Sequence, residues 1–385
     1  MSRKWFLMAG CVSLLCLCMP IPAQAQDSID ISSASCVLID NGSGARLYEK
    51  DSTAPLASAG MGRLMDIMVS MDSNSDTVTY KADDHQYKTK VGLTDGATYN
   101  VEDLRYASIL ANGEDAADAL SDLYDDTLQR MNDKAAKIGM TATTYTNTYG
   151  YEDGETSTAY DIALLAREFA RNEDLKIYYS ADKYTPTSFD NNQELSRTLM
   201  SYDGIIGGYE TASDQAKTVA VTSAERNGMS LTAVVMGAAD KDTAEKELTL
   251  LLNYGFDHYK NVTIQKENVA DETLDLTKGN TQYHITFSLK TDINVLMAAD
   301  SDESSLSTSV EYENKDDPDA VNAYLVVKQD GKEAGKMKLD KSVKKEKVTK
   351  KAGIGFFDGF AIFLAMLFTG LYLLKHLTLA IKPKE

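Results

Sequence analysis

Apolar and polar positions follow two different patterns along the chain, and the change between them predicts two structured regions. Up to Gly255-Phe256, segments with helical spacing of apolar residues are mixed with short apolar strands. Residues 262–339 instead show short alternating strands separated by turn sequences. We therefore expect residues 27–259 to form an α/β sandwich and residues 262–339 to form a small all-β domain.

Individual elements follow from the same patterns. Residues 35–40 and 45–49 predict a hairpin around the turn Gly42-Ser43-Gly44. Residues 64–71 are too apolar for an exposed helix and predict a central, buried one. Further helices are predicted at residues 104–110, 116–138, 161–171 and 243–254, and further strands at 76–80, 218–221, 230–236, 283–289 and 323–327.

The two ends of the chain carry targeting patterns. Arg3 and Lys4, an apolar run and the small-x-small sequence that ends at Ala25 predict a signal peptide over residues 1–25, because the run is too short for a retained anchor. Residues 353–374 are apolar apart from Asp358 and predict a transmembrane helix, with an in-plane amphipathic helix as the alternative.

These end segments define the expected location. The lysine-rich residues 340–352 are interpreted as a juxtamembrane linker and residues 375–385 as a cytoplasmic tail. We expect an exported protein anchored in the cell membrane, with its globular domains on the extracytoplasmic side.

Charge and residue counts exclude several classes of function. The formal net charge of −19, which becomes −21 when Arg3 and Lys4 leave with the signal, argues against a nucleic-acid partner. Three of the four cysteines lie in the signal peptide, so Cys36 has no internal disulfide partner and is expected to be a core residue. The four histidines (His85, His258, His284 and His376) lack metal-ligand spacing, so no metal or cofactor is predicted.

The order of several short segments identifies a family. These segments are Ser-Cys-Val-Leu-Ile-Asp at 35–40, Leu-Thr-Asp-Gly-Ala-Thr-Tyr-Asn-Val-Glu-Asp-Leu at 93–104, Ile-Gly-Met at 138–140, Ser-Thr-Ala-Tyr-Asp at 157–161 and Asn-Tyr-Gly-Phe at 253–256. In this order the chain resembles the low-molecular-mass penicillin-binding proteins, exported serine D-alanyl-D-alanine carboxypeptidases that trim peptidoglycan stem peptides. The resemblance implies a β-lactamase/DD-peptidase-like α/β sandwich, a β module and a membrane-binding C-terminus.

The first motif of this family is altered at both chemical positions. Ser-x-x-Lys places a nucleophilic hydroxyl and an amine base one helical turn apart. Aligned on Leu64-Met65, the matching residues here are Gly60-Met61-Gly62-Arg63. Gly60 has no nucleophile, and arginine is no general base at neutral pH. Ser58 does not rescue the motif, because Met61 lies three positions after it.

The other two motifs are altered as well. Ser-x-Asn aligns with Asn112-Gly113-Glu114. The amide of Asn112 therefore stands in place of the serine hydroxyl, and the carboxylate of Glu114 in place of the asparagine amide. Lys-Thr-Gly, expected on a strand edge, aligns with Ile206-Gly207-Gly208, which removes the cation and hydroxyl that would hold a substrate carboxylate. Ser180–Lys183 and Ser342–Lys345 do spell Ser-x-x-Lys, but we interpret both as chance matches.

We therefore predict a membrane-anchored, catalytically inactive homologue that binds peptidoglycan or an envelope protein. The alternatives are an active serine-type carboxypeptidase and a purely structural envelope protein. In the family the first-motif lysine lies beside the second-motif asparagine, so Arg63 and Glu114 are expected to form an ion pair. Glu114 is also expected to repel an incoming carboxylate.

Overall fold

The computed structural model describes residues 29–82, 84–148, 155–190 and 193–347. The predicted signal peptide, transmembrane helix and cytoplasmic tail lie outside these residues. Within them, no helix has the length and apolar character needed to cross a membrane. The chain divides into two compact units, one with residues up to 265, 292–309 and 326–337 and the other with 266–291, 310–325 and the chain from 338 onward. The predicted boundaries at 259 and 262 stay predictions.

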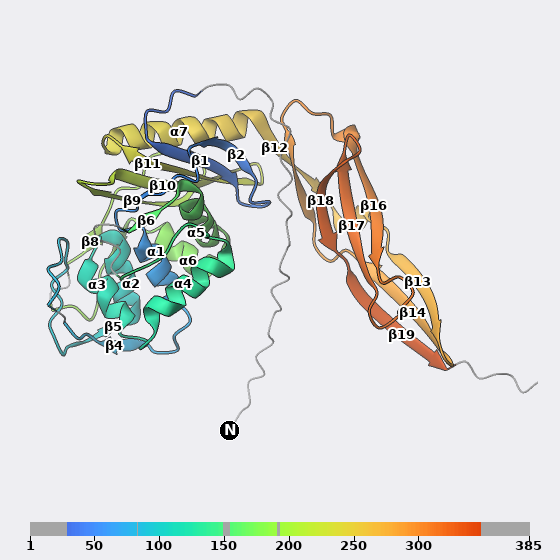
Figure 1. Ribbon diagram of the computed structural model, residues 1–385, viewed down its shortest axis with the longest axis horizontal. Helices are drawn as coiled ribbons and strands as arrows, with labels where there is room; N and C mark the ends of the chain where they lie inside the picture. The colour runs from blue at the N-terminus through green and yellow to red at the C-terminus, as the bar shows by residue number, and fades with distance from the viewer. Residues whose placement is uncertain (1–28, 83, 149–154, 191–192, 348–385) are drawn as a thin grey trace, which may run out of the picture. The chain divides into compact units, whose positions relative to one another are not determined.

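A five-stranded antiparallel sheet forms the centre of the larger unit (Figure 1). Its strand order is β2-β1-β11-β10-β9, which puts β9 at an edge. The strands span Ser35–Asp40 (β1), Arg46–Lys50 (β2), Ile205–Ser213 (β9), Lys217–Arg226 (β10) and Met229–Ala238 (β11). The predicted hairpin around Gly42-Ser43-Gly44 is thus confirmed, and the predicted strands 218–221 and 230–236 lie in β10 and β11, which form a second hairpin.

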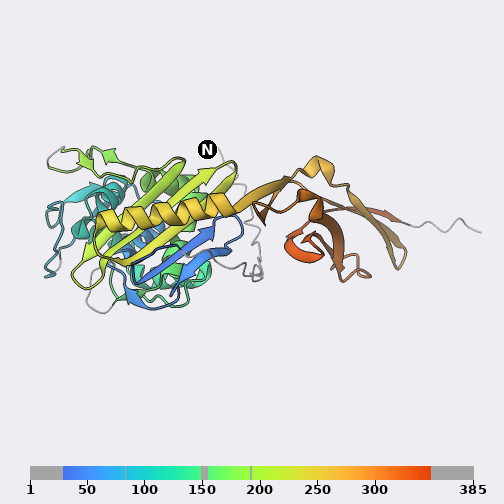
Figure 2. The same ribbon diagram turned by 90° about the horizontal axis from the view of Figure 1, so that it is seen from above.

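Side-chain alternation along β1 separates two cores, one on each face of the sheet. Cys36 and Leu38 pack with α7 (Lys241–His258), which lies along one face (Figure 2). Val37 and Ile39 pack with the remaining helices on the other face. Burial raises the pKa of the Cys36 thiol to about 12, in keeping with its predicted place in the core. The predicted α/β sandwich is confirmed.

The helical layer on the second face contains most of the predicted helices. They span Gly62–Ser70 (α1), Val101–Leu110 (α2), Glu114–Ser121 (α3), Thr127–Ile138 (α4), Ala159–Arg171 (α5) and Glu173–Tyr179 (α6). Short strand pairs connect them, namely β3 (Leu56–Ala57) with β6 (Thr156–Ser157), β4 (Thr77–Thr79) with β5 (Thr98–Asn100), and β7 (Lys183–Tyr184) with β8 (Leu195–Ser196). Every residue of α1 is buried, as predicted for the central helix.

The single long helix predicted over residues 116–138 is wrong, because the chain breaks between α3 and α4. At the break the backbone N–H groups of Leu123 and Tyr124 bond to carbonyls three residues earlier, which tightens the turn. The Thr127 hydroxyl then donates to the Ser121 carbonyl oxygen at 2.8 Å and satisfies a carbonyl that the helix would otherwise use. Asp125 and Asp126, both weak helix formers, lie inside this break.

From Tyr259 onward the described chain is built from strands and two short 3₁₀ turns, as predicted for the β-rich region. The strands span Tyr259–Ile264 (β12), Glu272–Lys278 (β13), Thr281–Ser288 (β14), Ile293–Ala298 (β15), Leu306–Glu313 (β16), Asn322–Gln329 (β17), Lys332–Lys338 (β18) and Asp340–Lys347 (β19). They form the sheets β12-β15, β13-β14-β19 and β16-β17-β18.

One sequence interpretation is corrected in this region. Residues 340–352 were expected to be a linker, but residues 340–347 form β19, which pairs antiparallel with β14. Its lysines suit an exposed edge strand, because charged side chains on an edge oppose pairing with another chain.

Asp66 is an unusual member of the central helix. Its side chain is 1% exposed, and neither carboxyl oxygen has a hydrogen-bond partner among the described residues. Burial, followed by the charge of Asp118, raises its pKa well above the ordinary value, against the opposing effect of Arg105. The folded state therefore holds the Asp66 proton more tightly than the unfolded state does.

We predict a pH-dependent gain in stability for Asp66→Asn. The protonated Asp66 carboxyl makes its full contribution to the free energy of unfolding below the unfolded-state pKa of about 4. That contribution is lost as the pH rises from there toward the folded-state pKa, by up to about 1.4 kcal/mol per pH unit. The gain of D66N over the parent chain in urea unfolding should therefore be larger at pH 7.5 than at pH 5. The exposed control D125N should show no such difference, and an equal gain at both pH values for D66N would contradict the prediction.

Candidate functional site

The first-motif residues lie where the chain enters α1, but not as the sequence predicted. The family motif would place the residue at position 60 one helical turn before the base, whereas α1 begins only at Gly62, two residues after Gly60. Ala59 and Gly60 both have positive φ angles, of 51° and 90°. Gly60 therefore lies in a left-handed turn before the helix, a conformation that disfavours serine or any other residue with a side chain.

The Arg63 guanidinium fills the space that a side chain at position 60 would need. A Cβ atom built on Gly60 would lie 2.7 Å from Nη1 and 3.0 Å from Cζ of Arg63. Such distances are shorter than carbon and nitrogen atoms tolerate without a shift. A serine at position 60 and the observed placement of Arg63 therefore exclude each other.

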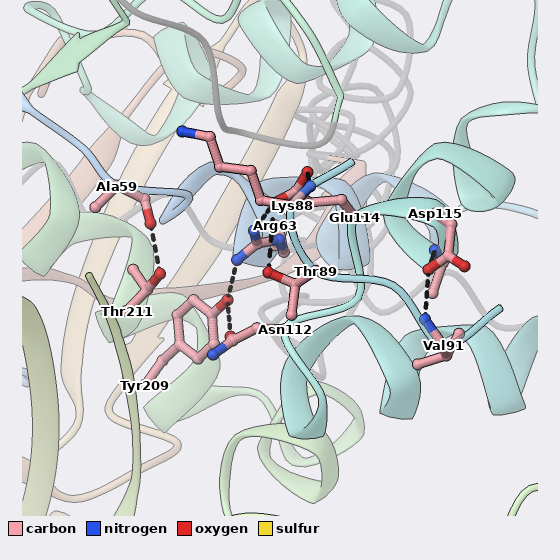
Figure 3. Close-up of polar contacts among 11 residues, drawn as sticks. Ala59, Arg63, Lys88, Thr89, Val91, Asn112, Glu114, Asp115, Tyr209 and Thr211 are labelled. Atoms are coloured by element: carbon pink, nitrogen blue, oxygen red, sulfur yellow. Dashed lines mark hydrogen bonds and ion pairs between the residues drawn. The ribbon is translucent and has the colours of Figure 1, made fainter. Parts of the chain in front are cut away.

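Arg63 and Glu114 form the ion pair that the sequence predicted (Figure 3). Arg63 Nη2 lies 3.8 Å from Glu114 Oε1, and both side chains are only 1% exposed. Arg63 Nη1 also donates a hydrogen bond of 2.8 Å to the Tyr209 hydroxyl, which in turn donates one of 2.7 Å to Asn112 Oδ1. Residues from the first two motifs are thus brought together with the strand that carries the third.

Glu114 and its neighbour Asp115 also fix the loop segment that runs over the start of α3. Glu114 Oε2 accepts a 2.9 Å hydrogen bond from the Lys88 backbone N–H, while its own N–H donates to the Thr89 carbonyl. Asp115 accepts from the backbone N–H groups of Val91, Gly92 and Leu93. The expectation that Glu114 repels an incoming carboxylate is therefore revised, because its charge is buried and paired.

The third-motif residues lie on the edge strand β9, as predicted, but the strand is irregular there. The pairing of β9 with β10 shifts register next to Ile206, so Ile206 lies at a bulge and is half-buried. At Gly207 a Cβ atom would meet the carbonyl oxygen of Tyr179 at 2.5 Å. At Gly208 it would meet the Val221 carbonyl oxygen at 2.8 Å. Neither glycine position accepts a threonine-sized side chain without a backbone shift.

The end of α6 is held firmly against Gly207. The Arg197 guanidinium donates to the carbonyl oxygens of Tyr178, Tyr179 and Ala181, which caps the helix C-terminus. Burial lowers the pKa of Arg197 to about 10. Because the Tyr179 carbonyl is fixed in this way, the space beside position 207 is closed by backbone rather than by a movable side chain.

Sequence reasoning missed several residues that complete this cluster. Tyr209 bridges Arg63 and Asn112, and Thr211 donates a 2.6 Å hydrogen bond to the Ala59 carbonyl oxygen. The available signal was the alternation along β9, since Gly207, Tyr209 and Thr211 are spaced two apart and share a face. The role of Tyr179, distant in sequence, had no comparable signal.

Other sequence candidates stay apart from this cluster. Ser180 caps the end of α6 while Lys183 lies in β7, and Ser342 and Lys345 are three residues apart on β19, so neither pair shares a helix face. Ser58 is buried just before the left-handed turn. Across the described residues, no group of His, Cys, Asp or Glu side chains could hold a metal ion.

The side chains of Arg63, Glu114, Tyr209 and Thr211 form a buried polar cluster. The hydroxyl of Tyr209 is held between an arginine and an amide, and that of Thr211 is bonded to a backbone carbonyl. The base position is occupied by a guanidinium that does not accept a proton. The hydrogen bonds of this cluster connect α1, the α2–α3 turn and β9.

We predict that Arg63 and Glu114 are strongly coupled in stability. Arg63→Met should lower the free energy of unfolding by about 3–5 kcal/mol, because it leaves the Glu114 charge buried without its partner. The double variant R63M/E114Q should recover much of that loss. Urea unfolding of the parent, both single variants and the double variant measures the coupling.

The pair Glu173–Lys176 provides the matched control, because water reaches it: the Glu173 side chain is 83% exposed and that of Lys176 29%. The same cycle with E173Q and K176M should give coupling close to zero, since water screens an exposed pair. Equal coupling in the two cycles would contradict a special role for the buried pair.

Comparisons with known proteins agree with this fold. Residues 22–240, more than half of the chain, match the family model described as D-alanyl-D-alanine carboxypeptidase. The chain is 26% identical over 330 residues to D-alanyl-D-alanine carboxypeptidase DacF of Bacillus subtilis. This match covers 80% of this chain and 81% of that protein.

Penicillin binding protein 5 from Haemophilus influenzae has the same fold, with a TM-score of 0.66 and 20% identity over 82% of this chain and 98% of the other. A Mycobacterium tuberculosis D-alanyl-D-alanine carboxypeptidase structure gives a TM-score of 0.55 and 24% identity, covering 61% of this chain and 96% of its own. The chain belongs to the D-alanyl-D-alanine carboxypeptidase family.

Proposed function

We propose that this family member is a catalytically inactive protein of the bacterial cell envelope that binds peptidoglycan or scaffolds a partner protein without cutting. The observation that carries the proposal is the Arg63 guanidinium in the space that the side chain of a nucleophile would occupy. An acyl-transfer serine at position 60 needs that space for its own Cβ and hydroxyl.

The number of altered positions supports inactivity over an impaired enzyme. Loss of one member of a catalytic serine set lowers turnover by a factor on the order of 10⁴ to 10⁶, and the losses do not simply add. Here Gly60 replaces the nucleophile, Arg63 the base and Asn112 the second-motif hydroxyl. Ile206 and Gly207 likewise lack the cation and hydroxyl of the third motif.

Location at the membrane is supported by sequence alone. The signal-peptide pattern of residues 1–25 and the apolar residues 353–374 favour export followed by anchoring at the membrane surface. Because the family acts on peptidoglycan, a wall-facing position would bring the folded units within reach of that polymer.

We predict that the purified full-length chain does not form a covalent adduct with a fluorescent penicillin. The reason is that no hydroxyl replaces the missing nucleophile at the motif positions. Gel fluorescence after incubation measures the adduct, and an active D-alanyl-D-alanine carboxypeptidase such as the Bacillus relative is the positive control. A stable labelled band, or D-alanine release from a pentapeptide, would refute inactivity.

The variant G60S/R63K sharpens this test. It restores the serine and lysine of the first motif, yet it should remain unlabelled. Position 207 is closed by the Tyr179 carbonyl, and the Glu114 carboxylate beside position 63 would favour the charged form of the lysine, which cannot accept a proton. Labelling of this variant would show that the first motif alone separates the chain from an enzyme.

Binding without cleavage predicts retention on the wall polymer. In a sedimentation assay with purified peptidoglycan sacculi, the full-length chain should appear in the pellet while the sacculi release no D-alanine. A soluble protein of similar net charge is the control, because acidic surfaces alone should not sediment. Failure to sediment would favour the purely structural alternative.

A further inference from the structure

A polar cavity of about 630 Å³ lies in the larger unit, away from the motif positions. It is lined by residues 73–76 after α1, by residues 100–103 and Arg105 at the start of α2, and by Tyr178, Tyr184 and Thr187. None of the residues aligned with the family motifs contributes to its lining. Its volume falls in the range of about 300–1,000 Å³ that is usual for ligand sites.

The cavity and the motif cluster lie at opposite ends of the same two helices. Arg63 is in the first turn of α1, and Ser70 is its last residue. Arg105, which lines the cavity, donates to the Ser70 hydroxyl at 2.8 Å and to its carbonyl oxygen at 2.7 Å. At 1.5 Å per residue, Arg63 and Ser70 are about 10 Å apart along the helix. The strands β4 and β5 near this end also lie far from the five-stranded sheet (Figure 1).

The inner wall of the cavity is rigid. Asp103 is 1% exposed and accepts hydrogen bonds from the Ser188 N–H and hydroxyl, both at 2.7 Å, and from the Tyr184 hydroxyl at 2.6 Å. Burial works to raise the pKa of Asp103, but these bonds outweigh it and lower the pKa, so the group stays ionised. The Tyr106 ring stacks on Tyr184 at 3.9 Å and packs on Tyr178 at 4.8 Å. Such a wall needs little reorganisation to receive a ligand.

The outer wall presents two carboxylates that are not used internally. Asp76 and Glu102 are exposed, and within the described part of the chain neither side chain has a hydrogen-bond or ion-pair partner. With Asp103 they give three carboxylates against the single guanidinium of Arg105, a balance that disfavours anions. Hydroxyl and amide groups complete the lining, from Ser73, Asn74, Ser75, Asn100 and Thr187. Of these, the Asn100 amide already donates to the Thr187 hydroxyl at 3.0 Å, and that hydroxyl donates to Asp103 at 3.3 Å.

We propose that this cavity binds a neutral oligosaccharide. Sugar hydroxyls donate to carboxylates and exchange hydrogen bonds with hydroxyl and amide groups, which are the groups this lining offers. Tyr184, which is half-buried, adds some aromatic surface to the lining, whereas Tyr178 is 3% exposed and supports the wall from inside. A small amine would satisfy the carboxylates alone and leave most of the volume to water. The site deepens the proposed function, on which it rests for the source of the ligand, the glycan chains of peptidoglycan.

The test is calorimetric titration of the purified full-length chain with chitotetraose, a neutral β-1,4-linked aminosugar oligomer. We expect saturable binding of one oligomer per chain. The double variant D76A/E102A should weaken it about tenfold or more, through loss of two hydrogen-bonding carboxylates. Ser75→Trp, which places a bulky ring in the lining, should abolish binding. The exposed control D125A, outside the cavity, should leave binding unchanged.

Each remaining outcome would overturn the proposal. The first is no saturable binding of chitotetraose. The second is unchanged binding by D76A/E102A and S75W when both variants have normal melting temperatures. The third is binding of the diamine cadaverine in place of the sugar. Failure here is distinct from failure of the proposed function. Sacculi that retain the chain without chitotetraose binding would overturn this site alone, whereas a penicillin adduct would overturn inactivity and leave the sugar titration standing.

Discussion

The buried ion pair between Arg63 and Glu114 is the interaction on which the centre of the larger unit depends. Burying two charges is unfavourable unless each is paired and its remaining hydrogen-bonding groups are satisfied. Here Tyr209 accepts from Arg63, and the Lys88 backbone N–H donates to Glu114. The pair therefore constrains its surroundings, because losing any of these partners would leave a buried charged group without one of its hydrogen bonds.

The same contacts close the space between the edge strand and the helices. Tyr209 joins β9 to α1 and to the α2–α3 turn, and Thr211 bonds to the chain just before α1. Gly207 lets β9 approach the end of α6, where any Cβ atom would strike the Tyr179 carbonyl. Both ends of this stretch of β9 are thus held against the helical layer by contacts that leave no room for larger side chains.

Much of the larger unit was predictable because it depends on local pattern. Alternation in β1 placed Cys36 and Leu38 on one face of the sheet, and the apolar run of α1 identified the central helix. The Arg63–Glu114 pair followed from motif register, since both positions adjoin in the family. The parts that failed depend on particular hydrogen bonds that the apolar pattern does not reveal. The break before Thr127 requires its hydroxyl to reach Ser121, and β19 becomes a strand through pairing with β14, residues that are distant in sequence.

The residues at the motif positions fit one another structurally. Gly60 adopts a left-handed conformation and has no Cβ, so the guanidinium can lie against its backbone. A buried guanidinium needs a nearby carboxylate, and Glu114 supplies it where the family has an amide. Both charged side chains therefore belong to the core, each being 1% exposed. At the other end of α1 and α2, Asp76 and Glu102 remain exposed around a polar cavity. In this chain, ligand recognition is therefore better sought at that end of the helices than at the positions where the family carries out its chemistry.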